Sequence, residues 1–365
     1  MLDVYFYEAF REEERWLRSL LPATIRAGFT WKTIQEADDG MPPAGLISIR
    51  TQSIVPGAWG RALGGVLSRS TGYDHLAQYR SGHRSKSATG AGTAAATDLA
   101  GTGTAERGPA LGYLPLYCHR AVAEQAMLLW MALLRRLPQQ IAQFRSFTRD
   151  GLTGRECAGK TLVVVGVGNV GSEVVRIGTG LGMNVIGVDP VHRHDFVRYE
   201  SAEVALPGAG VIVCSMNLTA DNVGYFDLER LSTAPRGVFF VNVARGEMSP
   251  PGVLLTLLEA EQLGGVGLDV HDHESDLAVA LRSMHPGRDG AGGEPAGSGS
   301  AKSRAEGLTE ATRQTLELAR HPQVILTPHN AFNTEEAVER KAAQTIAQVE
   351  RFLRAGDFLW PVPPA

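Results

Sequence analysis

The stretch that decides the fold is TLVVVGVGNVGSEVVRIGTGLGMNVIGVDP, residues 161–190. It opens with a β-branched run, LVVV, which is typical of a strand buried on both faces. Glycines follow, then apolar residues that share one face of a helix, and then a second apolar run that ends at Asp189. This order of strand, tight turn, helix and strand predicts the βαβ unit of a dinucleotide-binding fold.

The turn carries the pattern G-x-G-x-x-G at Gly166, Gly168 and Gly171. The first glycine allows a sharp turn, the second lets the backbone approach a pyrophosphate, and the third lets the helix pack closely on the strand. The N–H groups at the start of the helix also point toward bound phosphates. We therefore predict cofactor contacts at these three glycines and at Asn169 and Val170.

Asp189 ends the second strand, 18 positions after Gly171, about where a carboxylate accepts hydrogen bonds from an adenosine ribose. The same carboxylate would repel the 2′-phosphate of NADP. The sequence therefore predicts NAD as the cofactor, and the nearby Arg193 is the feature that opposes this choice.

The composition is that of a soluble globular protein. The chain has 365 residues, enough for two domains, and its net charge of −4 without a basic block argues against a nucleic-acid partner. The longest apolar stretch, 126–134, is about half a membrane span, and no signal-peptide pattern opens the chain. Three widely spaced cysteines predict reduced thiols, so we expect a cytoplasmic protein that does not contact a membrane.

The alternation of apolar runs with helical segments predicts a parallel, doubly wound sheet after residue 160. Its expected strands are 161–165, 184–188, 211–214, 238–243, 265–270 and 324–327. The earlier part of the chain and the C-terminus have expected strands at 2–7, 45–51 and 65–69 and expected helices at 11–21, 121–137 and 335–355, with Pro138 ending the second helix. Two stretches rich in small polar residues, 81–109 and 285–307, are predicted to be flexible insertions.

Three segments place reactive side chains after expected strands, where a doubly wound sheet presents its functional groups. VNVARGE contains Arg245, GLDVHDHE contains Asp269 and Glu274, and LTPHNAF contains His329. A guanidinium can hold a carboxylate with two hydrogen bonds. Together with a histidine as proton donor and an acid beside it, this set suits hydride transfer to a 2-keto acid.

VGVGNVG, VNVARGE, GLDVHDHE and TPHNAFNT, in this order, resemble the D-isomer-specific 2-hydroxyacid dehydrogenases. The resemblance implies that His329 is the general acid/base, that Glu274 bonds to it and that Arg245 binds the substrate carboxylate. It also implies cofactor contacts at Ala244 and Asp269, the latter with the nicotinamide carboxamide. Relatives form dimers, so a homodimer is expected.

The resemblance further implies an α/β protein of two doubly wound parallel-sheet domains, with a Rossmann NAD-binding domain inserted into a flavodoxin-like substrate domain. The substrate domain is predicted at 1–118 plus 332–365 and the nucleotide domain at 119–331, with the active site in the cleft between them.

Two segments point to the D-lactate dehydrogenase branch of the family. RSTGYDH resembles the loop whose backbone amides, here those of Thr71 and Gly72, bind the substrate carboxylate. LPLYCHRAVAE places Tyr117 where that branch has a substrate-contacting tyrosine, and Phe332 follows the histidine motif as it does there. The predicted activity is the NAD-dependent interconversion of a 2-keto acid and a D-2-hydroxy acid.

Two alternatives remain open from the sequence. One is an NAD(H)-sensing interaction protein resembling the C-terminal binding protein co-repressors, which share this fold. The other is a phosphoglycerate-type dehydrogenase, for which only Arg50 and Arg69 are obvious phosphate ligands. The run His271–Asp272–His273 raises the question of a metal site, but alternating loop residues do not fix a ligand geometry, and we predict none.

Overall fold

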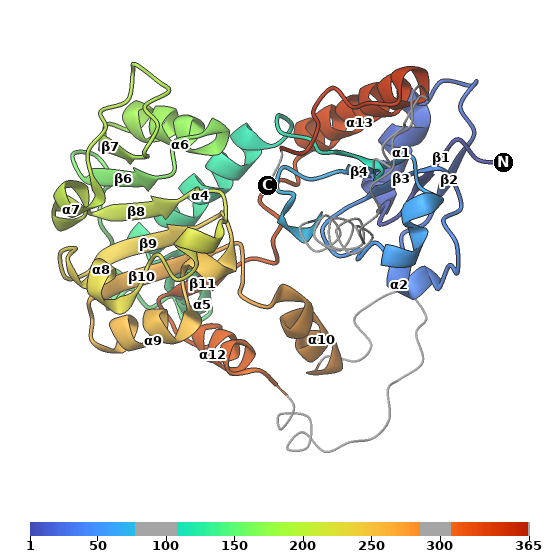
Figure 1. Ribbon diagram of the computed structural model, residues 1–365. Coiled ribbons are helices and arrows are strands. Elements are labelled where there is room, and N and C mark those ends of the chain that lie inside the picture. The colour runs from blue at the N-terminus through green and yellow to red at the C-terminus, as the bar shows by residue number, and fades with distance from the viewer. Residues whose placement is uncertain (77–107, 285–307, 364–365) are drawn as a thin grey trace, which may run out of the picture. The chain divides into compact units, whose positions relative to one another are not determined.

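The computed structural model describes residues 1–76, 108–284 and 308–363. The predicted insertions at 81–109 and 285–307 lie almost wholly outside these ranges. The chain divides into two compact units, Met1–Cys118 with Thr334–Ala365 and His119–Asn333 (Figure 1). They are called unit 1 and unit 2.

Unit 1 is built on a parallel sheet whose described strands have the order β2-β1-β3-β4-β5. Its strands are β1 (Val4–Phe6), β2 (Ala27–Phe29), β3 (Leu46–Ile49), β4 (Gly65–Ser68) and β5 (Ala110–Gly112). Its helices are α1 (Arg11–Leu20), α2 (Ile34–Ala37) and α13 (Glu335–Ala355), with the 3-10 turns η1 (Gly57–Arg61) and η2 (Asp74–Leu76).

The C-terminal helix α13 belongs to unit 1, far in sequence from the strands it covers. It packs along α1 and against β4 (Figure 1). Thr334 begins the helix by accepting a hydrogen bond from the backbone N–H of Ala337, and Gly356 ends it in the left-handed conformation at φ +74°. The prediction of a helix at 335–355 ended by Gly356 is therefore confirmed.

Unit 2 is built on a second parallel sheet with the described strand order β11-β10-β9-β8-β6-β7. Its strands are β6 (Thr161–Val165), β7 (Asn184–Val188), β8 (Val211–Cys214), β9 (Val238–Asn242), β10 (Leu263–Leu268) and β11 (Val324–Leu326). Its helices are α4 (His119–Leu134), α5 (Leu137–Gln143), α6 (Asn169–Gly180), α7 (Ala202–Ala205), α8 (Leu228–Ser232), α9 (Pro251–Glu259), α10 (Glu274–Met284) and α12 (Glu310–Leu318). Short 3-10 turns complete it: η3 (Leu206–Gly208), η4 (Ala220–Asn222) and η5 (Gly246–Met248).

Helices cover both faces of this sheet (Figure 1). On one face, apolar side chains of β6, β8, β9 and β10 form a core with α7, α8, α9 and α12. On the other face α4 lies against β9 and β10 and packs beside α6. Two parallel sheets with helices between their strands confirm the predicted α/β doubly wound fold.

Two details of the expected secondary structure are wrong. Pro138 does not end the helix expected at 121–137: α4 already ends at Leu134, Arg136 turns left-handed at φ +52°, and Pro138 lies in the first turn of α5. A proline is tolerated there because the first N–H groups of a helix have no partner inside it. Strands β2 (AGF) and β5 (ALG) were not expected, because three residues carry too little apolar periodicity.

Candidate active site

The glycine turn of unit 2 has the shape that the sequence predicts. Gly166 follows β6 at φ +90°, and a side chain on it would meet the Met216 backbone at 2.6 Å. A side chain on Gly171 would lie 2.0 Å from the Gly166 carbonyl oxygen, so α6 contacts the turn directly. Only glycine fits at these two positions.

The residues after β8 and β7 support the same turn. The Ser215 hydroxyl donates a hydrogen bond of 2.7 Å to the Gly166 carbonyl. The Asp189 carboxylate accepts hydrogen bonds from the backbone N–H groups of Val167 at 2.7 Å and Val191 at 2.8 Å. Asp189 therefore ties the end of β7 to the turn after β6, and Ser215 is a supporting residue that the sequence analysis missed.

These residues fit a dinucleotide. A side chain placed on Gly168 would meet nothing within 4 Å, so the turn offers open space beside its backbone at the N-terminus of α6. Peptide N–H groups and the helix dipole there attract a pyrophosphate. The partly buried Asp189 carboxylate, fixed at the end of the neighbouring strand, is the group that would bind a ribose.

A histidine–glutamate pair lies at the carboxyl ends of β10 and β11. His329 Nδ1 lies 2.8 Å from Glu274 Oε2, and the two side chains are 32% and 39% exposed. Glu274 is the first residue of α10, and its other oxygen accepts a hydrogen bond from the backbone N–H of His271. The pair joins two loops that are 55 residues apart in the chain.

The charge of Glu274 determines which ring nitrogen of His329 can react. Burial raises the pKa of the Glu274 carboxyl, but the hydrogen bond and charge of His329 and the His271 N–H outweigh it, so that pKa lies below its ordinary value. Glu274 is therefore a carboxylate at neutral pH and accepts the Nδ1 proton of His329. The ring nitrogen left to exchange a proton with a ligand is Nε2.

Asp269 fixes the loop that carries His329. Its carboxylate is fully buried and accepts hydrogen bonds from the Thr327 hydroxyl at 2.5 Å and from the backbone N–H groups of Asn330 at 3.0 Å and Ala331 at 2.8 Å. These contacts bracket His329, whose backbone is left-handed at φ +50°. Asp269 thus holds a conformation that is unfavourable for a non-glycine residue, while its predicted contact with the nicotinamide stays a prediction.

Arg245 lies three residues after the end of β9, at the same edge of the sheet. The buried Asn242 amide donates to the Arg245 carbonyl at 2.8 Å, and its oxygen accepts from the Ala244 N–H. A side chain on Gly246 would lie 2.0 Å from the His271 carbonyl carbon, so this segment touches the loop that leads to Glu274. Asn242 was not predicted, although it is the polar end of an otherwise apolar strand.

The His271 side chain joins two loops of unit 2 through a hydrogen bond. Its Nε2 lies 2.9 Å from the Thr327 carbonyl oxygen, and because a carbonyl only accepts, the ring donates this hydrogen bond. It thereby joins the loops after β10 and β11. Within the described ranges, no group of three His, Cys, Asp or Glu side chains has the arrangement of a metal site.

The predicted substrate residues of unit 1, Thr71, Gly72 and Tyr117, each contact a neighbouring side chain. Thr71 Oγ1 lies 3.2 Å from Cys118 Sγ, next to Tyr117, whose carbonyl accepts a hydrogen bond from Arg340 Nε. The Lys341 ammonium lies 5.7 Å from the centre of the Tyr117 ring. The Gly72 carbonyl accepts from the Ser70 hydroxyl. The fourth predicted substrate residue, Phe332, belongs to unit 2, directly after Ala331.

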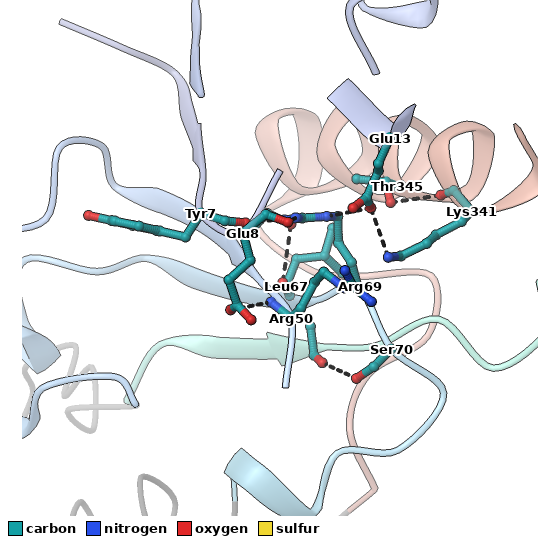
Figure 2. Close-up of polar contacts among 11 residues, drawn as sticks. Tyr7, Glu8, Glu13, Arg50, Leu67, Arg69, Ser70, Lys341 and Thr345 are labelled. Atoms are coloured by element: carbon teal, nitrogen blue, oxygen red, sulfur yellow. Dashed lines mark hydrogen bonds and ion pairs between the residues drawn. The ribbon is translucent and has the colours of Figure 1, made fainter. Parts of the chain in front are cut away.

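Arg69 is not a phosphate ligand. Its side chain is fully buried and donates to Glu13 Oε1 at 2.8 Å, to the Ser48 hydroxyl and to the backbone carbonyls of Tyr7 and Glu8. Four of its five N–H groups thus have acceptors within the protein (Figure 2). This removes one of the two basic residues on which the phosphoglycerate-type alternative depends.

Comparison with known proteins identifies the class of protein that this fold and site define. Residues 127–331, more than half of the chain, match the model of the NAD binding domain of the D-isomer specific 2-hydroxyacid dehydrogenases. The chain therefore belongs to the D-isomer-specific 2-hydroxyacid dehydrogenase family. The predicted family and the NAD cofactor are confirmed.

Individual relatives agree with this assignment. The chain is 29% identical over 245 residues to 2-hydroxyacid dehydrogenase A of Aspergillus oryzae. The aligned region covers 66% of this chain and 64% of that protein. It is 26% identical over 246 residues to an aromatic 2-oxoacid reductase of Clostridium sporogenes, covering 66% and 67%. The fold is that of D-lactate dehydrogenase from Aquifex aeolicus, solved with NAD and lactic acid, with a TM-score of 0.76 over the full length of both chains at 24% identity.

Proposed function

We propose that this protein interconverts a 2-keto acid and a D-2-hydroxy acid with NAD as the hydride carrier. The observation that carries the proposal is the 2.8 Å contact between His329 Nδ1 and the Glu274 carboxylate, in a loop whose conformation is held by Asp269. Family membership and the names of the relatives, a 2-hydroxyacid dehydrogenase and a 2-oxoacid reductase, support it over a sensing protein.

Bound NADH would supply the hydride that reduces the carbonyl carbon of the substrate. The turn from Gly166 to Gly171, including Asn169 and Val170, would hold its pyrophosphate, Asp189 its ribose, and Ala244 and Asp269 its nicotinamide end. The backbone contacts of Gly166, Gly171 and Asp189 support this assignment, because they fix the turn before any ligand binds.

His329 would give the second half of the reduction, a proton on the carbonyl oxygen. The Nδ1–H of His329 donates its hydrogen bond to Glu274. The Nε2–H therefore gives its proton to the carbonyl oxygen as the C–H bond forms, and Nε2 takes a proton back in the reverse reaction. Positive charge on the ring is balanced by the Glu274 carboxylate. Positioned general acids of this kind contribute roughly 10²–10⁴-fold to a rate.

Arg245 and the backbone amides of Thr71 and Gly72 are the proposed ligands of the substrate carboxylate, and Tyr117 and Phe332 are proposed to contact its side chain. Arg245 is supported by its position after β9, where Asn242 fixes the backbone of the segment. Unit 1 is thus proposed as the substrate domain and unit 2 as the nucleotide domain.

We further propose a cytoplasmic homodimer. Among the described residues, no helix is long and apolar enough to cross a membrane. Cys118, Cys157 and Cys214 are not in disulfides, as expected in a reducing compartment. Apolar side chains of α4, α5 and the turn after them lie exposed and would suit a subunit interface: Leu128, Leu137, Ile141, Phe144 and Phe147. Sedimentation of the wild type and of Ile141→Asp tests the dimer, since the variant should sediment as a monomer.

The test of the activity is NADH oxidation at 340 nm with pyruvate, 2-ketoisocaproate, phenylpyruvate and 2-ketoglutarate, for the wild type and His329→Asn. We expect turnover by the wild type and a loss of about 10³-fold in kcat for the variant. NADH binding, measured by fluorescence, should stay within threefold. Turnover that survives in His329→Asn, or no turnover by the wild type on any acid, would contradict the proposal.

A further inference from the structure

Two serines and a histidine near the end of strand β4 take no part in the mechanism above. Ser68 ends β4, Ser70 lies two residues later, and His75 belongs to the 3-10 turn η2. Ser68 Oγ lies 2.6 Å from Ser70 Oγ and 2.9 Å from His75 Nε2. Ser70 Oγ in turn lies 2.5 Å from the Gly72 carbonyl oxygen. These contacts form one continuous line of hydrogen bonds, and we call His75, Ser68 and Ser70 the loop tether.

The direction of each hydrogen bond in the loop tether follows from the bond at its end. A carbonyl oxygen only accepts, so the single hydrogen of the Ser70 hydroxyl is donated to Gly72. Ser70 therefore accepts from Ser68, which uses the single hydrogen of the Ser68 hydroxyl. It follows that His75 Nε2 carries a hydrogen and donates it to Ser68. All three hydrogens point along the line toward Gly72, and hydrogen bonds aligned in this way strengthen one another.

This direction excludes a nucleophilic role for the two serines. A serine nucleophile gives its hydrogen to a histidine that acts as a base. In the loop tether the histidine donates to Ser68, which is the reverse arrangement. Both serines are also buried, with exposed fractions of 0% for Ser68 and 8% for Ser70. The tether therefore acts on the backbone at which it ends.

That backbone belongs to the loop proposed to bind the substrate carboxylate. The start of the loop is fixed, because the Arg69 N–H donates to the Ile49 carbonyl at 2.7 Å and the Ser70 carbonyl accepts from the Leu114 N–H at 3.1 Å. Gly72 has no side chain, and glycine has more backbone freedom than any other residue. The hydrogen bond from the Ser70 hydroxyl to the Gly72 carbonyl restricts this freedom at the residue whose amide is a proposed ligand.

We propose that His75, acting through Ser68 and Ser70, is a positioning residue that holds the backbone of Gly72, and with it the amide that binds the substrate carboxylate. The inference rests on the proposed function. The carboxylate is bound before and during the reaction alike, so loss of the loop tether should raise KM and leave kcat nearly unchanged. The proposed NADH contacts lie in unit 2, so NADH binding should also stay unchanged.

The experiment compares two replacements of His75 that differ in the hydrogen-bond donor. His75→Leu removes the donor, and we expect KM for the keto acid with the fastest turnover to rise about tenfold while kcat changes by less than twofold. His75→Gln keeps a donor, because the amide nitrogen of glutamine can take the place of the ring Nε2, and its KM should stay within threefold of the wild type. The dissociation constant of NADH, measured by fluorescence, should be the same for all three proteins.

A double-mutant cycle tests whether the loop tether works as one unit. Ser68→Ala interrupts the same line and should also raise KM about tenfold. Adding His75→Leu to Ser68→Ala should raise KM by less than a further twofold, because the line is already broken. Ser53→Ala is the control: this buried serine of unit 1 accepts from the Ile34 N–H, outside the tether, and its loss should leave KM unchanged. Circular dichroism checks that each variant is folded, and if Ser68→Ala is not, the two replacements of His75 decide.

Three results would overturn the inference while the proposed function stands. The first is a KM of His75→Leu equal to that of the wild type, and the second is a KM of His75→Gln as high as that of His75→Leu. The third is a double variant in which the two effects on KM multiply. If the wild type reduces no keto acid at all, the proposed function itself fails.

Discussion

The two units place polar residues at the same part of a parallel sheet and use them in opposite ways. In unit 2, His329 and Glu274 lie about one third exposed after β11 and β10. In unit 1, Arg69 and Glu13 pair at the same distance, 2.8 Å, with 0% and 5% of their side chains exposed. Contact distance alone therefore does not distinguish a reactive pair from a structural one; the difference lies in burial.

Burial changes what the loss of one partner does. A half-exposed carboxylate that loses its partner is still hydrated, so removing the pair affects proton transfer more than stability. A buried cation that loses its partner stays unpaired in a medium of low polarity. The comparison therefore predicts that variants of the His329 pair lose activity and keep their fold, and that variants of the Arg69 pair lose stability.

Arg69→Met should give the largest effect. It leaves Glu13 with one cation fewer and removes donors from the Ser48 hydroxyl and two backbone carbonyls, at a cost of about 3–5 kcal/mol in the free energy of unfolding. Urea unfolding followed by circular dichroism measures it, with the exposed Arg61→Met as the matched control. A loss below about 1 kcal/mol would mean that the Arg69–Glu13 pair is not structural.

Acid should weaken unit 1 through Glu13. Burial raises the pKa of this carboxyl, but Arg69, Lys341 and Arg50 outweigh it and lower the pKa to about 2. Since the pKa falls on folding, the stabilisation is complete above about pH 4.5 and is lost as the pH falls toward 2, about 3 kcal/mol in all.

Urea unfolding between pH 5 and pH 2.5 tests this dependence on Glu13. Glu13→Gln should flatten the pH dependence, whereas Glu14→Gln, the more exposed neighbour, should leave it unchanged. If Glu13→Gln does not fold, Lys341→Met should move the acid-sensitive range to higher pH. Identical curves for wild type and variant would refute the role of Glu13.

Glu274→Gln should lower activity while leaving stability nearly unchanged, the opposite of Arg69→Met. The amide keeps the shape of the side chain but removes the charge that balances the His329 ring, so kcat should fall by about 10²-fold. The melting temperature should change by less than about 3 °C, because both side chains are partly exposed. The exposed Glu229→Gln is the control. A large loss of stability with unchanged kcat would reverse our assignment of the two pairs.

The sequence predicts unit 2 well because its motifs are local. Gly166, Gly171 and Asp189 lie within one βαβ segment, so their spacing alone determines how they meet. Pairing of His329 with Glu274 needed the family resemblance, since 55 residues separate them and no periodicity relates the two loops.

Unit 1 was harder to predict because its contacts are distant in the chain. Lys341 lies more than 300 residues from Glu13, and each has the pattern of an ordinary helix surface residue. Their burial follows from the packing of α13 on α1, which the sequence does not encode in a local signal. Asp269 was found by its position, but its role in holding the His329 loop depends on hydrogen bonds that only the structure shows.

We propose that the His329 ring moves the proton in the reduction of a 2-keto acid. The most direct measurement is the rate of NADH oxidation by His329→Ala with and without added imidazole. We predict a loss of about 10³-fold in kcat and a partial recovery that increases with imidazole concentration, because the free base can occupy the place of the missing ring. Wild-type turnover by His329→Ala in the absence of imidazole would contradict the account.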